Sequence, residues 1–524
     1  MNMYGVAIGR SAVVSLSPLA SEVGIRILKK GGNAVDAAVA TSLTIAVVEP
    51  GWMGLGGGGF ALVHMNDGSM EIVDHREVAP NGINLSDYDV EENKSSGYSS
   101  IGVPGFVAGL LYLHEKYGIL SLKEIFHYPM KYASKGIVVS PLWEFAMKNI
   151  PRSLEKIRQN KYSSNVFLRD NQIYKTGELL IQKDLANTLK HILEEGVDTF
   201  YRGYVADQII KDMEENNGTI SSADLNLYSV KIREPLVYEV GGYKFVTMPP
   251  PGSGALLVEG LKILNELSLD RENIERLLLR TLQLLMHERD LYIHDPDFIE
   301  GADPSKFLSD KHIDEAKNIV TDKSYPIEKC CGKEDRGTAH ISVVDQEGSM
   351  VSLTETLECF MGSGVAIKNT GLLMNDELHD FDYNPQSSNY IQPGKRPRSS
   401  MSPTIVFKDD KPLLVIGASG GTRIVSALLQ VLLYRLFLDM DLVSAMFKPR
   451  LHYFNNKVYV EGFNLKYAPR DTVVEDVSKR GILNPYFGKY SIYMGAVEAI
   501  EFLDNGFVLG VSDPRKQFGV STLE

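Results

Sequence analysis

Apolar residues recur at helical spacing near the N-terminus of the chain. This pattern predicts two helices, from Pro18 to Leu28 and from Val35 to Val48. Ser17 is suited to cap the first helix, because a serine hydroxyl can accept a hydrogen bond from an unpaired N–H of the first turn. Gly31, Gly32 and Asn33 break the pattern between the two helices, and Pro50 ends the second.

The rest of the first two thirds is also predicted to be largely helical. Residues 105–215 show mainly helical periodicity. A short strand is predicted at Tyr243–Thr247, and Ser253 is suited to cap the helix that follows the proline run. The polar segment 321–337 then has few apolar residues and is typical of a linker.

Strand-like alternation dominates after this segment. His340–Asp345 and Met350–Leu357 flank Gln346-Glu347-Gly348 and predict a hairpin. Further strands are predicted at 402–407 and 412–416, with a helix at 423–438. Together these patterns predict a mixed α+β architecture.

Composition excludes several classes of protein. The 524 residues are 44% apolar and 23% charged, which is typical of a globular chain and not of a disordered or fibrous one. With 54 basic and 67 acidic residues the net charge is −13, so we expect no nucleic-acid partner and no anionic membrane partner. The apolar run Ala37–Val48 is too short to span a bilayer.

The cysteines and the N-terminus indicate the compartment. Cys330, Cys331 and Cys359 cannot form a disulfide framework and suit a reducing environment. No basic segment followed by a long apolar one opens the chain, so no signal peptide is evident. We therefore expect a cytoplasmic protein.

Several common site motifs are absent or lack their context. Gly54–Gly59 matches G-x-G-x-x-G, but a helix precedes it and a strand follows, so we favour a close backbone approach over a dinucleotide site. His287 and His294 lie near three acidic residues without an H-E-x-x-H motif, and we predict neither metal nor cofactor. No G-x-S-x-G elbow is present, and a lone Cys359 in a strand-like region favours packing.

The junction Gly337-Thr338 carries more specific chemistry. A glycine there ends the polar segment, and a threonine opens the first strand of the hairpin. A threonine hydroxyl at such a position can attack the preceding carbonyl and cleave the chain. The new N-terminal amine, with a pKa of ~7.7–8.0, can then act as the base for its own hydroxyl. Taken alone, however, Gly-Thr before a strand is common.

Motifs along almost the whole chain give this junction its context. They are GGNAVDAAVA (31–40), GLGGGGFALV (54–63), DHREVAP (74–80), VPG (103–105), MPPPGSG (248–254), DPDF (295–298), GTAHISVVDQEGSMVSLTETL (337–357), LLMNDELHDF (372–381), KRPRSSMSPTIV (395–406) and GASGGTR (417–423). In these motifs and their order the chain resembles the γ-glutamyltransferase (γ-glutamyltranspeptidase) family of N-terminal-nucleophile hydrolases.

The resemblance implies an αββα sandwich that two autoprocessed subunits form jointly. Residues 1–337 would be the large subunit and residues 338–524 the small one. The two subunits would stay together as a heterodimer, and assembly of heterodimers into a larger oligomer is left open. It also implies cleavage of γ-glutamyl amides such as glutathione through a threonyl acyl-enzyme, with transfer of the acyl group to water or to an amine. No cofactor is implied.

The resemblance also implies catalytic roles. Thr338 matches the processing site, with Gly337 before it, and the nucleophile. Thr356 matches the second threonine that orients the nucleophile. Gly420 and Gly421 match the glycines whose N–H groups form the oxyanion hole, although taken alone they suit a loop that enters a helix.

Other positions match substrate-binding residues of the family. Arg76 matches the arginine that binds the α-carboxylate of the glutamyl group, and Ser399 and Ser400 match the serines that help to hold it. Asp380 and Glu377 match the residues that receive the α-ammonium. Without the resemblance, Arg76 suits a surface ion pair and the serines suit a turn.

Three departures bear on the substrate. Glu358 stands where the family usually has an asparagine, so Glu358, Glu377 and Asp380 would bring three carboxylates to the amino end of the substrate, which suits a cation. The loop between Phe381 and Lys395 is shorter than a family lid, and we expect it to leave the site open. For Trp52 we favour a role in local packing.

Two other functions stay open at this point. The first is an amidase or acylase for a non-glutamyl substrate, of the glutaryl (cephalosporin) or oxamate type, and Glu358 motivates it. The second is an unprocessed relative without activity, because a shared fold does not guarantee a shared function.

Overall fold

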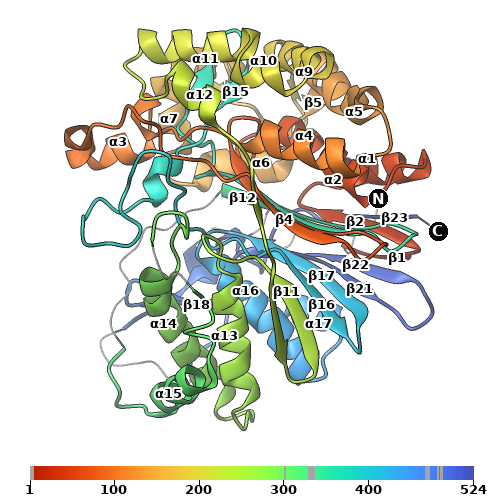
Figure 1. The fold of residues 1–524 in the computed structure, drawn as a ribbon, viewed down its shortest axis with the longest axis vertical. Coiled ribbons are helices and arrows are strands. Elements are labelled where there is room, and N and C mark those ends of the chain that lie inside the picture. Colours follow the sequence, from red (N-terminus) through yellow and green to blue (C-terminus); the bar gives the residue numbers. More distant parts are fainter. Residues whose placement is uncertain are drawn as a thin grey trace.

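Two β-sheets lie face to face in the middle of the molecule, and helices cover both outer faces (Figure 1). The computed structural model describes residues 5–299, 303–327, 337–465, 472–480, 483, 485 and 488–523. The first sheet contains seven strands in the order β23-β2-β12-β13-β3-β4-β9, and the second contains seven in the order β1-β22-β21-β17-β16-β11-β10. The predicted α+β architecture is therefore confirmed.

The central strands of the first sheet come from both parts of the chain. The strands are β2 (Ser11–Ser15), β3 (Gly58–His64), β4 (Met70–Asp74), β9 (Lys231–Arg233), β12 (Gly337–Val344), β13 (Met350–Glu358) and β23 (Gly519–Leu523). Strand β12 pairs with β2 on one side and with β13 on the other, and β13 pairs with β3. The predicted hairpin is confirmed, and it forms the centre of the sheet.

The second sheet is also antiparallel and also mixes the two parts. Its strands are β1 (Val6–Gly9), β10 (Leu236–Val240), β11 (Tyr243–Thr247), β16 (Thr404–Lys408), β17 (Lys411–Ser419), β21 (Ala496–Phe502) and β22 (Val508–Ser512). Strand β11 pairs with β16, which joins a strand from before residue 337 to one from after it. Smaller sheets are formed by β18 (Leu451–Phe454), β19 (Lys457–Val460) and β20 (Val473–Asp476), by β14 (Ala366–Ile367) with β15 (Leu372–Leu373), by β5 (Ile137–Val138) with β8 (Leu179–Leu180), and by β6 (Leu168–Arg169) with β7 (Gln172–Ile173).

Helices from the first half of the chain cover the first sheet. They are α1 (Pro18–Lys29), α2 (Ala34–Val48), α3 (Glu91–Ser95), α4 (Phe106–Tyr117), α5 (Leu122–Lys135), α6 (Pro141–Asn149), α7 (Ser153–Gln159), α8 (Lys161–Phe167), α9 (Lys183–Glu195), α10 (Val197–Tyr201), α11 (Tyr204–Glu215) and α12 (Ser222–Leu227). The two predicted N-terminal helices are confirmed. The Ser17 hydroxyl, however, makes no capping bond, whereas Asn33 and Asp36 form a reciprocal capping box at the start of α2.

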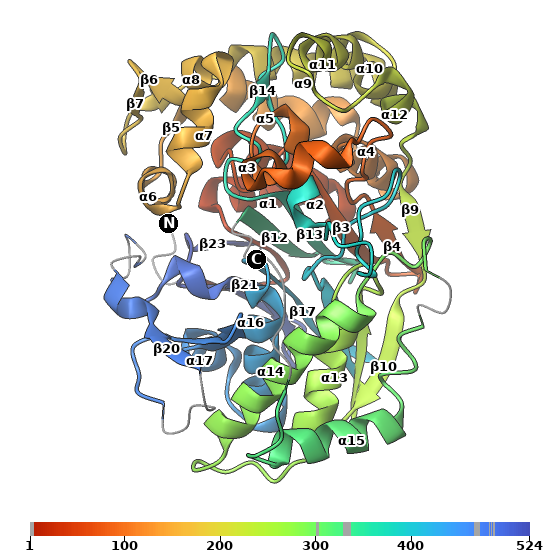
Figure 2. The ribbon, with the colours of Figure 1, turned by 90° about the vertical axis from the view of Figure 1, so that its left-hand side faces the viewer.

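The second sheet is covered by α13 (Gly254–Asn265), α14 (Ile274–Tyr292), α15 (Asp310–Thr321), α16 (Arg423–Leu432) and α17 (Leu442–Phe447) (Figure 2). A π-helical turn, Leu433–Phe437, extends α16, so the predicted helix at 423–438 is nearly complete. Ser253 precedes α13 without capping it, because its hydroxyl donates to the Ser399 carbonyl at 2.6 Å.

Side chains of β12 alternate strictly between the two faces of the first sheet. Ala339, Ile341 and Val343 pack into the core beneath the helices. His340 and Ser342 point the other way, and the Ser342 hydroxyl donates to the carbonyl of Glu498 in the second sheet at 3.0 Å. Thr338 shares this second face because strand side chains alternate. The register of the hairpin therefore decides that Thr338 faces the second sheet.

The two sheets meet closely at His340. Its Nδ1 lies 2.8 Å from Thr354 Oγ1 and its Nε2 lies 3.1 Å from Ser342 Oγ. Burial lowers the pKa of His340 to about 3, so the ring is neutral. A Cβ added at Gly417, in the opposite strand, would lie 2.1 Å from His340 Cε1.

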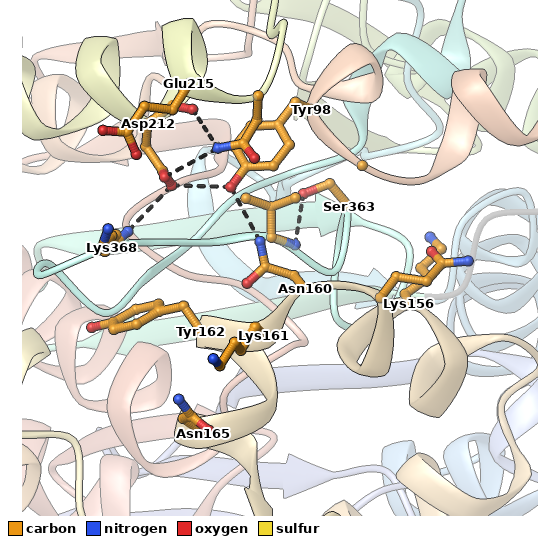
Figure 3. A pocket seen from close by; sticks show the side chains of 14 residues that line it. Tyr98, Lys156, Asn160, Lys161, Tyr162, Asn165, Asp212, Glu215, Ser363 and Lys368 are labelled. Carbon is orange, nitrogen blue, oxygen red and sulfur yellow. Dashed lines mark hydrogen bonds between the residues drawn. The ribbon is translucent and has the colours of Figure 1, made fainter.

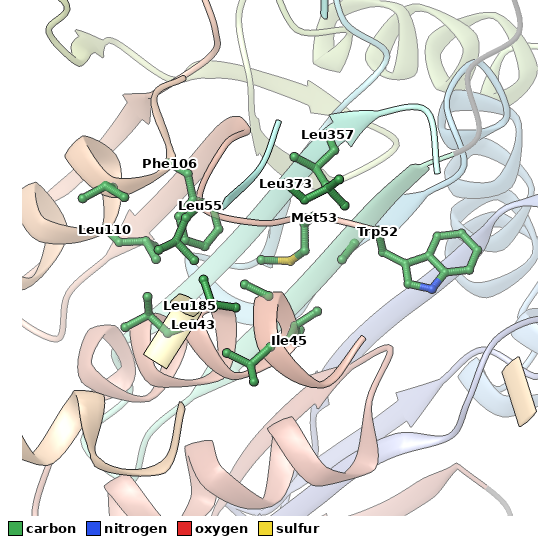
Figure 4. Packing of buried hydrophobic residues seen from close by; sticks show 14 of the residues in the cluster. Leu43, Ile45, Trp52, Met53, Leu55, Phe106, Leu110, Leu185, Leu357 and Leu373 are labelled. Atoms are coloured by element: carbon green, nitrogen blue, oxygen red, sulfur yellow. The ribbon is translucent and has the colours of Figure 1, made fainter. Parts of the chain in front are cut away.

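The glycine run from 54 to 59 connects α2 to β3 and lies against β13. A Cβ at Gly57 would lie 2.0 Å from the Thr356 carbonyl oxygen, so the close backbone approach that we favoured is confirmed. Trp52, Met53 and Leu55, which lead into this run, are buried with residues of α2 (Figure 4). The run thus fixes the backbone beside Thr356.

Part of the predicted linker lies outside the described residues. Helix α15 ends at Thr321, and residues 328–336, which include Cys330 and Cys331, are not described. Among the helices that are described, none is both long enough and apolar enough to cross a membrane.

The contact between Gly417 and His340 gives a first prediction. Gly417→Ala forces a methyl group into the His340 ring, and overpacking of this kind costs about 1–3 kcal/mol of unfolding free energy. We expect a lower Tm in thermal unfolding. Gly54→Ala is the matched control, because its added Cβ meets only Leu357 Cδ1 at 3.8 Å. Equal Tm values for the two variants would contradict the close packing of the sheets.

Candidate active site

The two threonines singled out in the sequence lie opposite each other. Thr338 of β12 pairs with Thr356 of β13, and the register of the pair shifts between Gly337 and Thr338. The Thr356 hydroxyl donates to the Gly337 carbonyl, and it accepts a hydrogen bond from the Glu358 N–H at 2.8 Å. Thr338 is only 3% exposed. A hydroxyl donor thus lies on the carbonyl that precedes the candidate nucleophile.

Lys516 holds the other side of Thr338, and the sequence analysis missed it. Its Nζ donates to the Thr338 carbonyl at 2.6 Å and lies 4.2 Å from the centre of the Trp52 ring. Burial lowers the pKa of Lys516 to about 8, with the carboxylates of Glu498, Asp513 and Glu49 acting against this change. Because 178 positions separate Lys516 from Thr338, no local sequence signal could have found the contact.

Gly420 and Gly421 lie between β17 and α16, where the chain enters a helix. Their φ angles are 123° and 59°, and a Cβ at Gly420 would lie 2.8 Å from the Gly495 Cα. Gly420 lines a small cavity of about 30 Å³ together with Trp52, Arg423, Tyr493 and Lys516. Lys516 therefore links this glycine to Thr338, and Trp52, for which we favoured local packing alone, also borders the site.

Arg76 lies two residues beyond β4 and is completely enclosed. Its Nη2 forms ion pairs with Glu377 and, at 2.6 Å, with Asp380 Oδ2, and its Nη1 lies 3.7 Å from Glu77 Oε2. Burial alone would lower the pKa of Arg76, but the surrounding carboxylates, Glu377 first, raise it overall. Arg76 is therefore no surface ion pair, and its charge is balanced by protein carboxylates.

The three carboxylates expected at the amino end of the substrate lie together. Oxygen atoms of Glu358, Glu377 and Asp380 lie within 4.8 Å of one another. Burial raises the pKa of Glu377 well above its usual range, against the effect of Arg76, and burial raises the pKa of neighbouring Glu77 to about 7. Glu358 has a φ of 73°, a strained value for this residue type.

Ser399 and Ser400 lie beside this cluster, with both hydroxyls engaged by the protein. The Ser399 hydroxyl accepts from the Met401 N–H at 3.2 Å, and the Ser400 hydroxyl accepts from Arg289 Nε, also at 3.2 Å. Arg76 Nη2 donates to the carbonyl of Arg398, the residue before the pair, at 3.3 Å. Arg289, on α14, is a second neighbour of the site that the sequence did not indicate.

The site is closed, which corrects our expectation of an open one. Arg76 and Glu377 are at most 1% exposed. The short loop folds back onto the site, because the Asn389 side chain donates to the Asp380 carbonyl at 2.7 Å and Arg398 pairs with Asp382 at 3.1 Å. The short loop is thus tied to the backbone of Asp380, and the residues of the site are buried although the loop is short.

A larger cavity lies among the helices that cover the first sheet. It has a volume of about 640 Å³, and Tyr98, Lys156, Asp212 and Ser363 are among its lining residues (Figure 3). Lys156 Nζ pairs with Asp376 Oδ2 at 2.7 Å, and Asp376 directly precedes Glu377. The cavity is therefore connected to the site by one buried ion pair.

The histidines considered as metal ligands in the sequence do not form a metal site in the structure. Within the described ranges, the side-chain groups close enough to share an ion are Glu358–Cys359–His379, Glu259–Glu288–His312 and Glu358–Glu377–Asp380. Neither His287 nor His294 belongs to them. Cys359 follows β13 directly, and its N–H donates to Asp376 at 2.9 Å.

A model of the gamma-glutamyltranspeptidase family matches residues 20–523. The chain belongs to the γ-glutamyltranspeptidase family. Membership of this family, together with the similarity to named enzymes, identifies the chain as an enzyme.

Curated relatives of this family match over most of their length. The glutathione hydrolase proenzyme of Bacillus subtilis (strain 168) is 34% identical over 551 residues, which cover 98% of this chain and 91% of that protein. The capsule biosynthesis protein CapD proenzyme of Bacillus anthracis is 34% identical over 431 residues, which cover 81% of this chain and 75% of that protein.

Solved structures extend the similarity to the fold. Cephalosporin acylase from Bacillus halodurans superimposes with a TM-score of 0.86 at 25% identity, covering 99% of this chain and 97% of that one. γ-Glutamyltranspeptidase from Helicobacter pylori has a TM-score of 0.55 at 33% identity, covering 60% of this chain and 91% of that one. The expected αββα sandwich of the N-terminal-nucleophile hydrolases is thus confirmed.

The enclosed arginine of this γ-glutamyltranspeptidase-family chain gives a second prediction. Arg76→Gln leaves buried carboxylates without their cation, which costs about 3–5 kcal/mol of unfolding free energy. Glu77 and Glu377 then bind protons in the folded state more readily than in the unfolded chain, so the loss grows as pH rises. We expect a larger fall in denaturant midpoint at pH 8 than at pH 5.5.

The control for this variant is Arg26→Gln. Arg26 pairs with Glu22 on the surface, where the two side chains are 49% and 44% exposed. Its loss is expected to change stability by less than about 1 kcal/mol. A pH-independent loss in Arg76→Gln would contradict the role of the buried carboxylates.

Proposed function

We propose that this chain is the precursor of an N-terminal-threonine amidase that cleaves its own Gly337–Thr338 bond and then acts on γ-glutamyl amides. One observation carries the proposal: the Thr356 hydroxyl donates to the Gly337 carbonyl beside Thr338, across the β12–β13 pair. The similarity to proteins named glutathione hydrolase proenzyme supports the same substrate class.

Cleavage of the precursor follows from this geometry. The Thr338 hydroxyl attacks the Gly337 carbonyl carbon, and the Thr356 hydroxyl stabilises the negative charge that develops on the carbonyl oxygen. The C–N bond breaks as the Thr338 nitrogen takes up a proton, which leaves an ester between Gly337 and the Thr338 oxygen. Water hydrolyses this ester and releases residues 1–337 from the new N-terminal Thr338.

The same hydroxyl then carries out the amidase reaction. The free α-amine of Thr338 accepts the proton of its own hydroxyl, which attacks the γ-carbonyl of the substrate. Gly420 and Gly421 supply N–H groups to the oxyanion, while Lys516 holds the Thr338 carbonyl and thus the nucleophile. The leaving amine takes a proton, and water or a second amine resolves the acyl-enzyme.

The two products of cleavage are expected to remain one heterodimer. Strand β12 would pair with β2 of the large subunit, and β11 of the large subunit would pair with β16 of the small one. Because the subunits would share both sheets, they could not separate without unfolding. The cytoplasmic location stays a prediction from the cysteine content.

The carboxylate cluster determines how a γ-glutamyl group binds. The α-ammonium of the γ-glutamyl group would bind to Glu358, Glu377 and Asp380, whose oxygens lie within 4.8 Å of one another. Arg76 would hold the α-carboxylate with Ser399 and Ser400. Since Glu377 and Asp380 form ion pairs with Arg76, the substrate ammonium would pair with these carboxylates instead and release the arginine to bind the α-carboxylate.

One finding favours a second candidate function, although the carboxylates that already neutralise Arg76 would make its site acidic for an acyl group without an ammonium. The similarity to a cephalosporin acylase makes an amidase for a non-glutamyl acyl group the alternative. A substrate comparison separates the two functions.

Processing of the chain is the third prediction. On incubation of the purified protein, intact-mass spectrometry is expected to show two fragments, the smaller beginning Thr-Ala-His-Ile-Ser. Thr338→Ala removes the attacking hydroxyl and is expected to abolish both cleavage and turnover. Thr338→Ser keeps a hydroxyl and is expected to retain both at a reduced rate. An uncleaved wild-type chain without amidase activity would instead indicate the inactive relative.

The role of Glu358 is the fourth prediction. Glu358→Gln removes one charge from the ammonium pocket, and a hydrogen bond to a charged group is worth about 1.5–3 kcal/mol. We expect kcat/KM for a γ-glutamyl amide to fall by roughly 10- to 100-fold. The value for the matching glutaryl amide, which lacks the ammonium, should not fall.

Glu347→Gln is the control for this comparison, because Glu347 is exposed in the turn between β12 and β13. It should leave both substrates unaffected. Equal losses for the two amides in Glu358→Gln would show that Glu358 supports the structure instead of selecting the substrate. A wild-type enzyme that prefers the glutaryl amide would favour the acylase.

A further inference from the structure

Three helices outside the site described above bring two glutamates and a histidine together. Helices α13, α14 and α15 lie side by side on the outer face of the second sheet (Figure 2). They contribute Glu259, Glu288 and His312, respectively, and both glutamates are buried. The potential ligand atoms of the three residues lie within 4.8 Å of one another.

The distances in this cluster suit a shared ion. His312 Nε2 lies 3.0 Å from Glu259 Oε1 and 3.1 Å from Glu288 Oε1. Metal–ligand bonds of about 2.0–2.2 Å to nitrogen and oxygen place neighbouring ligands about 3 Å apart. The imidazole nitrogen therefore lies at nearly the separation from each carboxylate oxygen that a shared metal ion requires.

The cluster also has free coordination capacity. The second carboxylate oxygens, Oε2 of Glu259 and Oε2 of Glu288, are buried without a hydrogen-bond partner among the described residues. Among the residues that the structure describes, His312 is the only basic side chain that pairs with either glutamate. Burial raises the pKa of Glu259 well above its usual range, and the nearby Glu288 carboxylate raises it further.

Aromatic side chains fix the orientation of the imidazole. The rings of Tyr292 and Phe307 stack with centroids 4.9 Å apart. Each meets the His312 ring edge-on, at centroid distances of 6.1 Å and 6.5 Å. The histidine side chain retains 19% exposure, which leaves a route from solvent to the ligand atoms.

We propose that Glu259, Glu288 and His312 bind one divalent transition-metal ion, with solvent completing its coordination. One imidazole and two carboxylates suit Zn²⁺ or Mn²⁺. The ion takes the place of the protons that the carboxylates and the imidazole share in the metal-free protein. It ties three helices together, and one of them, α14, carries Arg289 to Ser400.

The sequence could not indicate this site, because its residues follow no ligand spacing. Glu259 and His312 are 53 positions apart on different helices. The sequence analysis examined His287 and His294 and predicted no metal. Only the packing of α13 against α14 and α15 brings the actual candidates together.

Metal binding to the full-length protein tests the proposal. After treatment with a chelator and dialysis against Zn²⁺, elemental analysis is expected to find one tightly bound ion per chain. Zn²⁺ in large excess over its Kd should raise the Tm by a few degrees, because an ion that binds only the folded state stabilises it. The same measurement with Mn²⁺ compares the two ions.

Glu259→Gln is the decisive variant, because glutamine matches the shape of a protonated glutamate and should fold normally. It is expected to lose the bound ion and the Tm shift. His312→Gln, at a partly exposed position, should also lose the bound ion and the Tm shift. It provides the test if Glu259→Gln fails to fold. Glu315→Gln, on the exposed side of α15, is the matched control and should retain both.

A further variant excludes the carboxylate cluster of the candidate active site. Asp380→Asn should bind Zn²⁺ as the wild type does, because Asp380 belongs to the other group. The proposal is overturned if the wild-type chain holds no ion after loading, or if Glu259→Gln and His312→Gln still bind one. These readouts need no turnover, so they do not depend on the proposed amidase activity.

Discussion

The register of β12 on β13 is the constraint on which the rest of the structure depends. Thr338 faces the second sheet only because Ala339, Ile341 and Val343 are buried beneath the helices on the opposite face. A slip of one residue would exchange the two sets, exposing the polar residues to the helical core. The apolar side chains of the hairpin therefore position the candidate nucleophile, although none of them takes part in the proposed chemistry.

Charge balance is the second feature that organises the site. Arg76 lies close to Glu77, Glu377 and Asp380, and Glu358 lies close to the last two, in a largely buried cluster where a charge without a partner is costly. The protein satisfies this requirement internally, since Arg76 pairs with Glu377 and Asp380. A ligand with both an ammonium and a carboxylate can replace these pairs by equivalent ones, whereas a ligand with only one charge cannot. In the proposed function, substrate binding is therefore linked to a redistribution of existing ion pairs.

The two parts of the chain on either side of residue 337 form one structure. Residues before it supply β2, β3 and β11, which pair directly with β12, β13 and β16 from the second part. The contact between Lys516 and Thr338 joins the end of the chain to the start of this second part. A cut at the junction would remove a single covalent bond from an assembly that both sheets hold together.

The sequence by itself determined the elements that depend on neighbouring residues. The alternation in 340–357 predicted the hairpin, and the motifs around Arg76, Thr338 and Gly420 predicted the family. The clustering of Glu358, Glu377 and Asp380 was also foreseen, because they occupy matching motif positions. Each of these patterns and motifs lies within a short stretch of sequence, so it can be recognised without knowing the tertiary structure.

Only the tertiary structure decided which distant residues meet. It placed Lys516 on Thr338 and Arg289 on Ser400, and it tied a short loop to the backbone of Asp380 beside the buried site. It also joined Glu259, Glu288 and His312 from three helices. Such contacts follow from the way sheets and helices pack against each other, and residues far apart in the chain carry no local pattern that records this packing.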